Sequence, residues 1–346
     1  MKDFKAAVIT KINKPLKLLN IKFKKPDSNQ VLVKILYSAF CSSQYGEISG
    51  VKGKDNFLPH CLGHEACALV IQVGIGVNKV KKNDLVVLHW MKSHGSDAGG
   101  IKYESKDYPK SINAGQITTF SEYSIVSENR LTKIPKNRFN LKILPLMGCS
   151  IPVAISTLEK ILNVRVGKNI LILGGGALGI PMIHYCRKML LSNIEVFEKR
   201  TRAIKKCKIF GSSKVYKNTG DHKLISNLKN NFYDYIVDTT GSAKLLSKIL
   251  QYPSRGKTVL VGVPRFNQKL TINTLKLNYG LKLFGSYGGD FSPEDDLLRY
   301  LSFFVKTNFN FKEYIDGIYS LKDVNKLIND YKNQKIFGKA LIKVAN

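Results

Sequence analysis

Long apolar runs are missing from this 346-residue sequence. No stretch approaches the roughly 18 to 20 uninterrupted apolar residues that a membrane-spanning helix needs. The opening residues, MKDFKAAVITKINKPLKLL, interrupt their apolar residues with lysine and asparagine, so they lack the apolar core of a secretory signal peptide. These absences predict a soluble, cytoplasmic protein with no membrane partner.

Closely paired cysteines are missing as well. No CxxC pair occurs, which excludes a zinc finger or a zinc ribbon. In a chain predicted to stay inside the cell, isolated cysteines are expected to be buried thiols or metal ligands rather than disulfides. The sequence contains six of them, Cys41, Cys61, Cys67, Cys149, Cys186 and Cys207.

Acidic residues are scarce: 25 Asp and Glu stand against 55 Lys and Arg, which gives a formal net charge of +30. A basic surface attracts nucleic acid. The basic residues are spread along the whole chain, however, with no Arg-rich block and no basic helix interleaved with aromatic residues. The charge therefore indicates non-specific attraction of anions and predicts no specific nucleic-acid partner. A role for it in holding anionic cofactors or substrates is a hypothesis.

The pattern of apolar and polar residues changes near the middle of the chain. The first part holds short apolar runs separated by Gly, Asn, Asp, Ser and Pro, which predicts a β-rich domain over residues 1–147. Over residues 148–287, apolar runs alternate with helix-compatible stretches, which predicts an α/β fold with a parallel sheet covered on both faces. Residues 288–346 are expected to form a C-terminal segment with two helices and a last strand. Residues 93–119 are expected to form one long loop.

A glycine-rich turn follows the predicted strand NILIL and precedes the predicted helix IPMIHYCRKMLL, which is the context of a dinucleotide-binding motif. It satisfies the GxGxxG pattern with Gly174, Gly175, Gly176, Ala177, Leu178 and Gly179. Gly174 permits the tight turn, Gly176 lets the backbone approach a pyrophosphate, and Gly179 lets helix and strand pack closely. The new helix offers free N–H groups and a positive dipole end to the phosphates.

A second strand, IEVF, ends at Glu198, 24 residues after Gly174. An acidic side chain there accepts hydrogen bonds from the ribose hydroxyls and repels a 2′-phosphate, which favours NAD over NADP. Lys199 and Arg200 follow at once and are able to serve a phosphate, which weakens that preference.

Cys41, His64 and Cys149 offer two thiolates and one imidazole, which are good zinc donors. Three protein ligands leave a fourth position open for water or substrate. Each residue also has a structural interpretation: Cys41 as a small core residue, His64 as a hydrogen-bonded histidine near a turn, and Cys149 as packing at the start of a helix. Their spacing over a hundred residues does not by itself bring them together.

Taken in order, five motifs resemble the medium-chain zinc alcohol dehydrogenases, and the resemblance covers nearly the whole chain. They are Cys41-Ser42-Ser43, Leu62-Gly63-His64-Glu65, Lys82-Asn83-Asp84-Leu85-Val86, Gly148-Cys149 and the glycine turn. The resemblance implies a GroES-like catalytic domain, completed by the C-terminal segment, joined to a Rossmann domain with the active site in the cleft. It also implies hydride transfer between an alcohol and a nicotinamide cofactor, and homodimers or homotetramers built through the edge of the Rossmann sheet, for which TINTLKL is a candidate strand.

The resemblance assigns roles to individual residues. Cys41, His64 and Cys149 look like the ligands of a catalytic zinc, which acts as a Lewis acid on the bound alcohol. Glu65 looks like the neighbouring carboxylate that exchanges with solvent as fourth ligand, and Ser43 looks like the hydroxyl that takes the substrate's proton.

Weaker correspondences extend to the cofactor. The run Val261-Gly262-Val263 resembles the backbone that meets the nicotinamide carboxamide. Lys339 resembles a basic residue near the pyrophosphate, with a solvated surface lysine as the alternative.

The chain also departs from the family pattern. Many relatives hold a second, structural zinc with four cysteines, but no cysteine lies between Cys67 and Cys149, which predicts one zinc per chain. Gln44 stands where relatives often have an aspartate bonded to the zinc histidine, and Gly46 where some have a proton-relay histidine. The missing structural-zinc cysteines, the absent relay histidine and the polar loop at residues 93–119 favour a polyol or sugar-like alcohol as substrate. The alternative is a zinc-free quinone or enoyl reductase using NAD(P)H, against which the intact Cys, His and Cys set argues.

Overall fold

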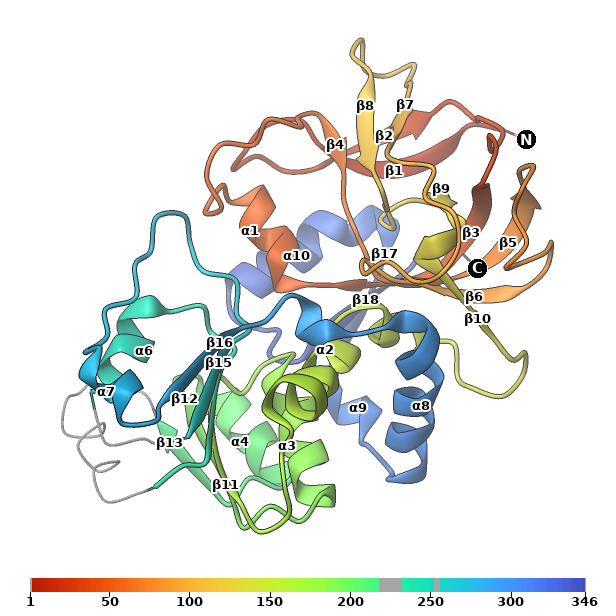
Figure 1. The fold of residues 1–346 in the computed structure, drawn as a ribbon. Helices are drawn as coiled ribbons and strands as arrows, with labels where there is room; N and C mark the ends of the chain where they lie inside the picture. The colour runs from red at the N-terminus through yellow and green to blue at the C-terminus, as the bar shows by residue number, and fades with distance from the viewer. Residues whose placement is uncertain (1, 218–231, 252–255, 346) are drawn as a thin grey trace. The chain divides into compact units, whose positions relative to one another are not determined.

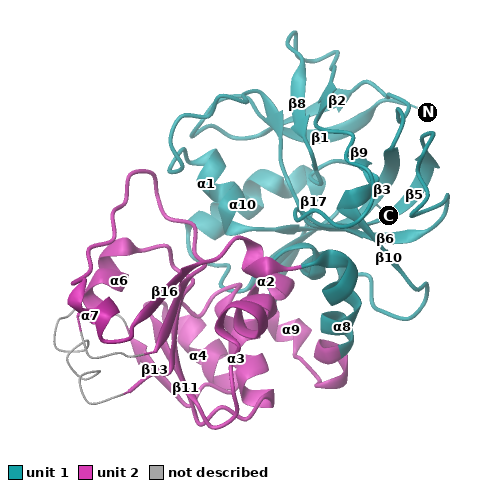
Figure 2. Cartoon of the chain, viewed as in Figure 1, with its two compact units in different colours: residues 1–150, 292–302, 315–346 teal, residues 151–291, 303–314 magenta. Residues whose placement is uncertain are grey.

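The computed structural model describes residues 2–217, 232–251 and 256–345. The chain divides into two compact units (Figure 2). Unit 1 comprises residues 1–150, 292–302 and 315–346, and unit 2 comprises residues 151–291 and 303–314. In the described ranges, no helix combines the length and the apolar character needed to cross a membrane.

Unit 1 is built on two sheets (Figure 1). One has the order β2-β1-β4-β8-β7, and the other the order β10-β6-β5-β3-β18-β17 with β9 also paired to β3. Their strands are β1 (Phe4–Ile9), β2 (Lys17–Ile21), β3 (Gln30–Phe40), β4 (His60–Cys61), β5 (Ala66–Val73), β6 (Leu85–Leu88), β7 (Ile101–Tyr103), β8 (Ile112–Gly115), β9 (Tyr123–Ser127), β10 (Leu131–Ile134), β17 (Ile315–Ser320) and β18 (Lys339–Lys343). The helices of unit 1 are α1 (Ser42–Ile48), α10 (Val324–Lys332) and the first part of α8 (Pro293–Lys306), with short turns at Glu128–Arg130, Leu144–Gly148 and Leu321–Asp323.

Alternate residues of the central strands of unit 1 point to one face and form its core. Val31, Val33 and Ile35 of β3 are fully buried and pack with Ala66 and Val70 of β5. This period of two follows from the pleat of a β-strand. The C-terminal strand β18 pairs antiparallel with β3, so the last residues of the chain complete a sheet begun by the first.

Unit 2 contains one parallel sheet of six strands in the order β13-β12-β11-β14-β15-β16. The strands are β11 (Asn169–Leu173), β12 (Asn193–Glu198), β13 (Lys214–Lys217), β14 (Tyr235–Asp238), β15 (Lys257–Leu260) and β16 (Lys282–Gly285). The helices are α2 (Ser150–Ser156), α3 (Gly179–Lys188), α4 (Thr201–Ile209), α6 (Ala243–Ile249), α7 (Leu275–Asn278), α9 (Phe311–Tyr314), the end of α8, a π-helical turn at Thr157–Leu162 and a short turn at Gly288–Asp290.

The order of this sheet is that of a dinucleotide-binding doubly wound fold, in which the order of the strands reverses between β11 and β14 while all strands stay parallel. Ile170 to Leu173 of β11 are all fully buried, as expected for a strand covered on both faces. The prediction of an α/β fold, with a GroES-like β-rich unit and a Rossmann-like parallel sheet, is confirmed.

Two local predictions are wrong. Residues 93–119 are not one long loop, because β7 and β8 lie within them and pair with each other, and β8 pairs with β4. The segment TINTLKL is not a strand: α7 occupies Leu275–Asn278, and the outermost strand of the described sheet on that side is β16. The elements in both segments are only three or four residues long, too short to show a local pattern in the sequence.

Candidate metal centre and cofactor site

Four candidate ligands converge inside unit 1. Each offers one ligand atom, and these atoms all lie within 4.8 Å of one another. The residues are Cys41, His64, Glu65 and Cys149. In the described part of the chain, this is the one such group of three or more His, Cys, Asp or Glu side chains.

Strand pairing explains how the first three meet. Cys41 directly follows β3, and His64 and Glu65 directly precede β5. The two strands are antiparallel, with Ser38 opposite Ala66, so the end of one lies beside the start of the other. The convergence is therefore a consequence of sheet register.

Cys149 arrives through a close backbone approach. A Cβ at Gly148 would lie 2.3 Å from the carbonyl oxygen of Leu88 and 2.7 Å from the Cβ of Glu65. Glycine is thus required for the chain to pass near enough to bring Cys149 to the cluster.

The electrostatics of the cluster favour a thiolate. A hydrogen bond from Cys149, together with nearby His64 and Lys339, holds the pKa of Cys41 well below its usual range. The same bond, with burial, raises the pKa of Cys149 well above its usual range. Burial raises the pKa of Glu65.

These donors fit a zinc ion. Two thiol sulfurs, one imidazole and one carboxylate are the groups that Zn²⁺ takes in proteins. Glu65 is 0% exposed, and its Oε2 atom is buried without a hydrogen-bond partner among the described residues. A buried acceptor left unpaired is costly, and a bound cation would satisfy it.

The glycine turn lies at the carboxyl end of β11, where α3 begins at Gly179. Gly174 has φ +100°, a conformation that favours glycine. A Cβ at Gly179 would lie only 2.0 Å from the carbonyl oxygen of Gly174, so strand and helix pack as closely as the motif requires. The hydroxyl of Tyr314 donates to the carbonyl oxygen of Ala177 at 2.6 Å and braces the turn.

Comparisons with known proteins point to alcohol dehydrogenases. Residues 27–136 match the family described as the alcohol dehydrogenase GroES-like domain. The chain is 26% identical to alcohol dehydrogenase-like 3 of Arabidopsis thaliana, covering 95% of this chain and 94% of the relative. It is 23% identical to S-(hydroxymethyl)glutathione dehydrogenase of Synechocystis sp., covering 95% and 97%. The crystal structure of benzyl alcohol dehydrogenase from Acinetobacter calcoaceticus superposes with a TM-score of 0.86 at 20% identity, covering 100% of both chains.

By these likenesses, the chain resembles the zinc-type medium-chain alcohol dehydrogenase family over nearly its whole length. It is accordingly an oxidoreductase of the alcohol dehydrogenase type.

In this dehydrogenase, Lys339 has a different partner from the one that the resemblance implies. Its ammonium is 1% exposed and forms an ion pair with Oε1 of Glu65, inside unit 1. It is not a solvated surface lysine. No local pattern predicts this contact, because the two residues are 274 positions apart.

Two polar residues near Cys41 are placed by α1. Ser43 is half-buried in the first turn of the helix. Gln44 is buried, and its Oε1 accepts a hydrogen bond from the backbone N–H of Cys41 at 3.2 Å. Gln44 therefore positions the backbone of a candidate ligand, a role that the sequence did not reveal.

The run Val261-Gly262-Val263 follows β15. The N–H groups of Val261 and Gly262 both donate to the carbonyl oxygen of Asp238, at 2.9 Å each. Val263 is 65% exposed. A cofactor that meets this run would therefore do so through the exposed Val263 and the carbonyl groups rather than through the first two amides.

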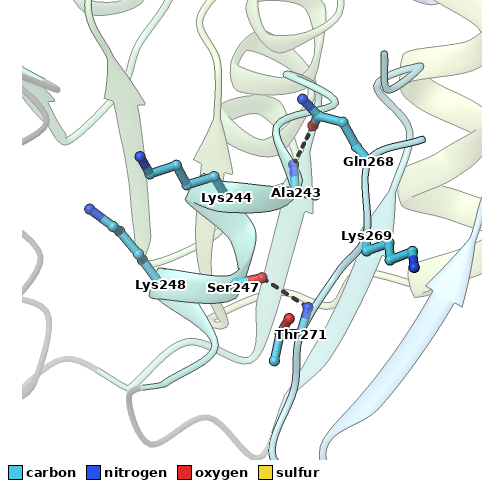
Figure 3. Close-up of a pocket in the computed structure, with 7 residues that line it drawn as sticks. All are labelled: Ala243, Lys244, Ser247, Lys248, Gln268, Lys269 and Thr271. Atoms are coloured by element: carbon cyan, nitrogen blue, oxygen red, sulfur yellow. Dashed lines mark hydrogen bonds between the residues drawn. The ribbon is translucent and has the colours of Figure 1, made fainter. Parts of the chain in front are cut away.

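A hollow of about 370 Å³ lies elsewhere on unit 2, beside α6 (Figure 3). None of the predicted site residues lines it. Its walls are Ala243, Lys244, Ser247, Lys248, Gln268, Lys269 and Thr271. It is an open basic hollow that is distinct from both candidate sites.

Proposed function

We propose that this protein is a zinc-dependent dehydrogenase that transfers a hydride between the hydroxyl-bearing carbon of an alcohol, polyol or sugar-like substrate and NAD. The observation that supports it most strongly is the convergence of Cys41, His64, Glu65 and Cys149 within 4.8 Å, in a chain that resembles the zinc-type family. One zinc ion per chain is part of the proposal.

Different residues of the protein would bind the metal, transfer the proton and position Glu65. Cys41, His64 and Cys149 would hold the metal, whose chemistry when bound is Lewis-acid polarisation of the substrate hydroxyl. Ser43, two positions after Cys41, takes the substrate's proton and releases its own hydroxyl proton to water. Lys339 holds one oxygen of Glu65, so that carboxylate keeps its second oxygen, Oε2, for a cation.

The choice of NAD depends on Glu198 at the end of β12, the position from which an acidic side chain meets the adenosine ribose. The polyol or sugar-like substrate class follows from the absent relay histidine at Gly46 and from the absent structural-zinc cysteines. Assembly into dimers or tetramers belongs to the same proposal, since it comes from the family resemblance.

The alternative, a zinc-free quinone or enoyl reductase, is not favoured. Such an enzyme has no use for two sulfurs, an imidazole and an unpaired buried carboxylate oxygen at one point. A purified, active chain with no bound zinc would favour this alternative.

A Cys149→Ser variant tests the metal centre. We expect bound zinc, measured by mass spectrometry, to fall from one per chain to near zero. Alcohol-dependent NADH formation should fall by more than about 100-fold. Losing a residue that only contacts a metal ligand costs up to about 100-fold in activity, and losing a ligand itself should cost more. Binding of NADH should persist, because the glycine turn belongs to unit 2.

Cys67→Ser provides the matched control. Cys67 is a buried cysteine of the same unit whose thiol donates to the carbonyl oxygen of Leu141, and a serine hydroxyl is able to make the same bond. This variant should keep both zinc and turnover. Full zinc content and full turnover in Cys149→Ser would show that the ligand assignment is wrong.

A further inference from the structure

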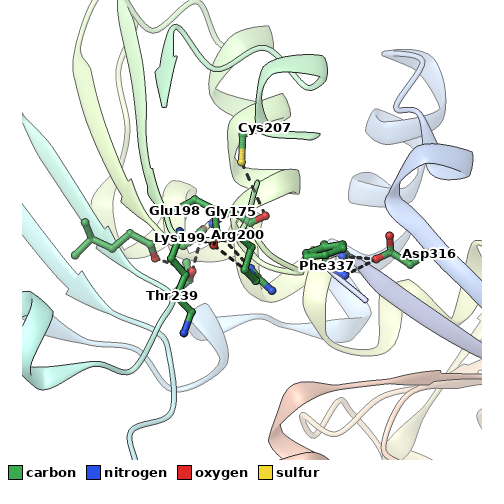
Figure 4. Close-up of polar contacts among 11 residues, drawn as sticks. Gly175, Glu198, Lys199, Arg200, Cys207, Thr239, Asp316 and Phe337 are labelled. Carbon is green, nitrogen blue, oxygen red and sulfur yellow. Dashed lines mark hydrogen bonds and ion pairs between the residues drawn. The ribbon is translucent and has the colours of Figure 1, made fainter. Parts of the chain in front are cut away.

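The carboxylate of Glu198 is the element expected to select the cofactor, and three backbone amides bind it. Its Oε1 accepts from the N–H groups of Lys199, at 2.8 Å, and Arg200, at 2.9 Å. Its Oε2 accepts from the N–H of Gly175 in the glycine turn at 2.9 Å. Figure 4 shows these contacts at the end of β12. The carboxylate is thus tied to the turn that would receive a pyrophosphate.

The side chain of Arg200 also donates two parallel hydrogen bonds to the carboxylate of Glu198. Its Nε donates to Oε1 at 3.0 Å and its Nη2 to Oε2 at 2.8 Å. Glu198 therefore accepts five hydrogen bonds. A carboxylate has about four lone-pair sites, so no acceptor capacity is left for ribose hydroxyls.

Glu198 carries a negative charge, which the positive charge of Arg200 offsets. Although burial acts to raise it, the pKa of Glu198 is held below its usual range by the guanidinium of Arg200 and by the amides of Arg200 and Gly175. The side chain of Glu198 is 3% exposed, whereas that of Arg200 is 23% exposed. An incoming 2′-phosphate would therefore meet the cation before the anion.

We propose that Arg200 is a specificity-determining residue that cancels the repulsion between Glu198 and a 2′-phosphate, so that this chain binds NADP with an affinity comparable to that for NAD. The proposal rests on the proposed function only in taking the glycine turn as the dinucleotide site. Both fork bonds of Arg200 are already made to Glu198, so what Arg200 offers a 2′-phosphate is its nearby positive charge. NAD remains a cofactor, but Glu198 does not exclude its phosphorylated form.

Fluorescence titration of the purified chain with NADH and with NADPH tests this without substrate or turnover. In the unmodified protein, the two dissociation constants should differ by less than about tenfold, because opposite charges offset each other. In Arg200→Ala, Glu198 is left unbalanced, so the NADPH constant should rise by at least about tenfold through like-charge repulsion. The NADH constant should stay level or fall, because the carboxylate regains capacity for ribose hydroxyls.

Two further variants make the test specific. Lys199→Ala removes the same charge from the adjacent, exposed position and should leave the ratio of the two constants within about threefold of the original. The double variant Glu198→Gln, Arg200→Ala removes both charges and should return the ratio close to that of the unmodified protein. Thermal unfolding of each variant checks that the fold is retained.

The possible failures are distinguishable. A preference for NADH of more than about tenfold in the unmodified protein would overturn the proposal, because uncompensated repulsion would then be present. Equal shifts in Lys199→Ala and Arg200→Ala would also overturn it, because net charge alone would explain them. Binding of neither dinucleotide would overturn both this proposal and the proposed function. Loss of zinc-dependent turnover with both dinucleotides still bound would overturn the proposed function alone.

Discussion

A Lys339→Met substitution removes the ammonium that contacts Glu65 inside unit 1 while keeping an unbranched side chain. Lys339 and Glu65 are 1% and 0% exposed, so water cannot replace the lost partner. The remaining carboxylate would be buried with a charge and no cation, or it would have to bind a proton. Either outcome costs folding free energy.

The cost is considerable. Breaking a buried ion pair by removing one partner destabilises a protein by about 3–5 kcal/mol. For a unit of this size, each kcal/mol shifts the melting temperature by roughly 2–4 °C, so the metal-free variant should melt roughly 10 °C below the unmodified protein. A bound zinc ion would restore a positive charge beside Glu65, so zinc should stabilise Lys339→Met more than it stabilises the unmodified chain.

The chain's single tryptophan, Trp90, lies in unit 1, so its fluorescence reports on unfolding there. Melting curves should be recorded with a chelator and with added zinc. The double variant Glu65→Gln, Lys339→Met removes both charges and should recover most of the lost stability in chelator. If Lys339→Met melted within about 2 °C of the unmodified protein in chelator, less than 1 kcal/mol would be at stake and the buried-pair reasoning would be refuted.

Two other substitutions test the turn and the core. Gly179→Ala would place a Cβ 2.0 Å from the carbonyl oxygen of Gly174, which should cost about 1–3 kcal/mol and weaken NADH binding in titrations. Gly285→Ala, which meets nothing within 4 Å, should leave NADH binding unchanged. Burial lowers the pKa of His89 from 6.5 to about 3, so its contribution to stability is complete above pH 6.5 and is lost as the pH falls toward 3. The test is His89→Gln, whose amide can still bond Thr132. Between about pH 8 and about pH 5, the free energy of unfolding measured in urea should fall by about 2 kcal/mol less in this variant than in the parent. An equal fall in both proteins would contradict a neutral buried histidine.

Local sequence signals predicted unit 2 well, because its elements are specified by short-range patterns. The unbroken apolar run of β11 indicates a strand covered on both faces, and Gly174 indicates a turn with positive φ. In the C-terminal segment, where two helices were predicted, α8 (Pro293–Lys306) begins with a proline and three acidic residues, which favour the first turn of a helix.

Unit 1 was harder to predict. Strands β7 and β8 have three and four residues, too few to show a period, and they exist because they pair with each other and with β4. Long-range contacts in unit 2 escape local patterns as well: nothing near Ala177 in the sequence indicates that the hydroxyl of Tyr314 will bond to it from 137 positions away.

The sequence by itself determined the kinds of chemistry available: two cysteines, a histidine and a glutamate suited to zinc, and a glycine turn suited to a pyrophosphate. The tertiary structure decided which groups meet. The register of β3 against β5 and β18 places Cys41, Glu65 and Lys339 together, and the end of β12 places Glu198 within reach of Arg200 and Gly175. The physical reason is that residue type sets what a side chain can bind, whereas strand pairing over hundreds of residues sets what it can reach.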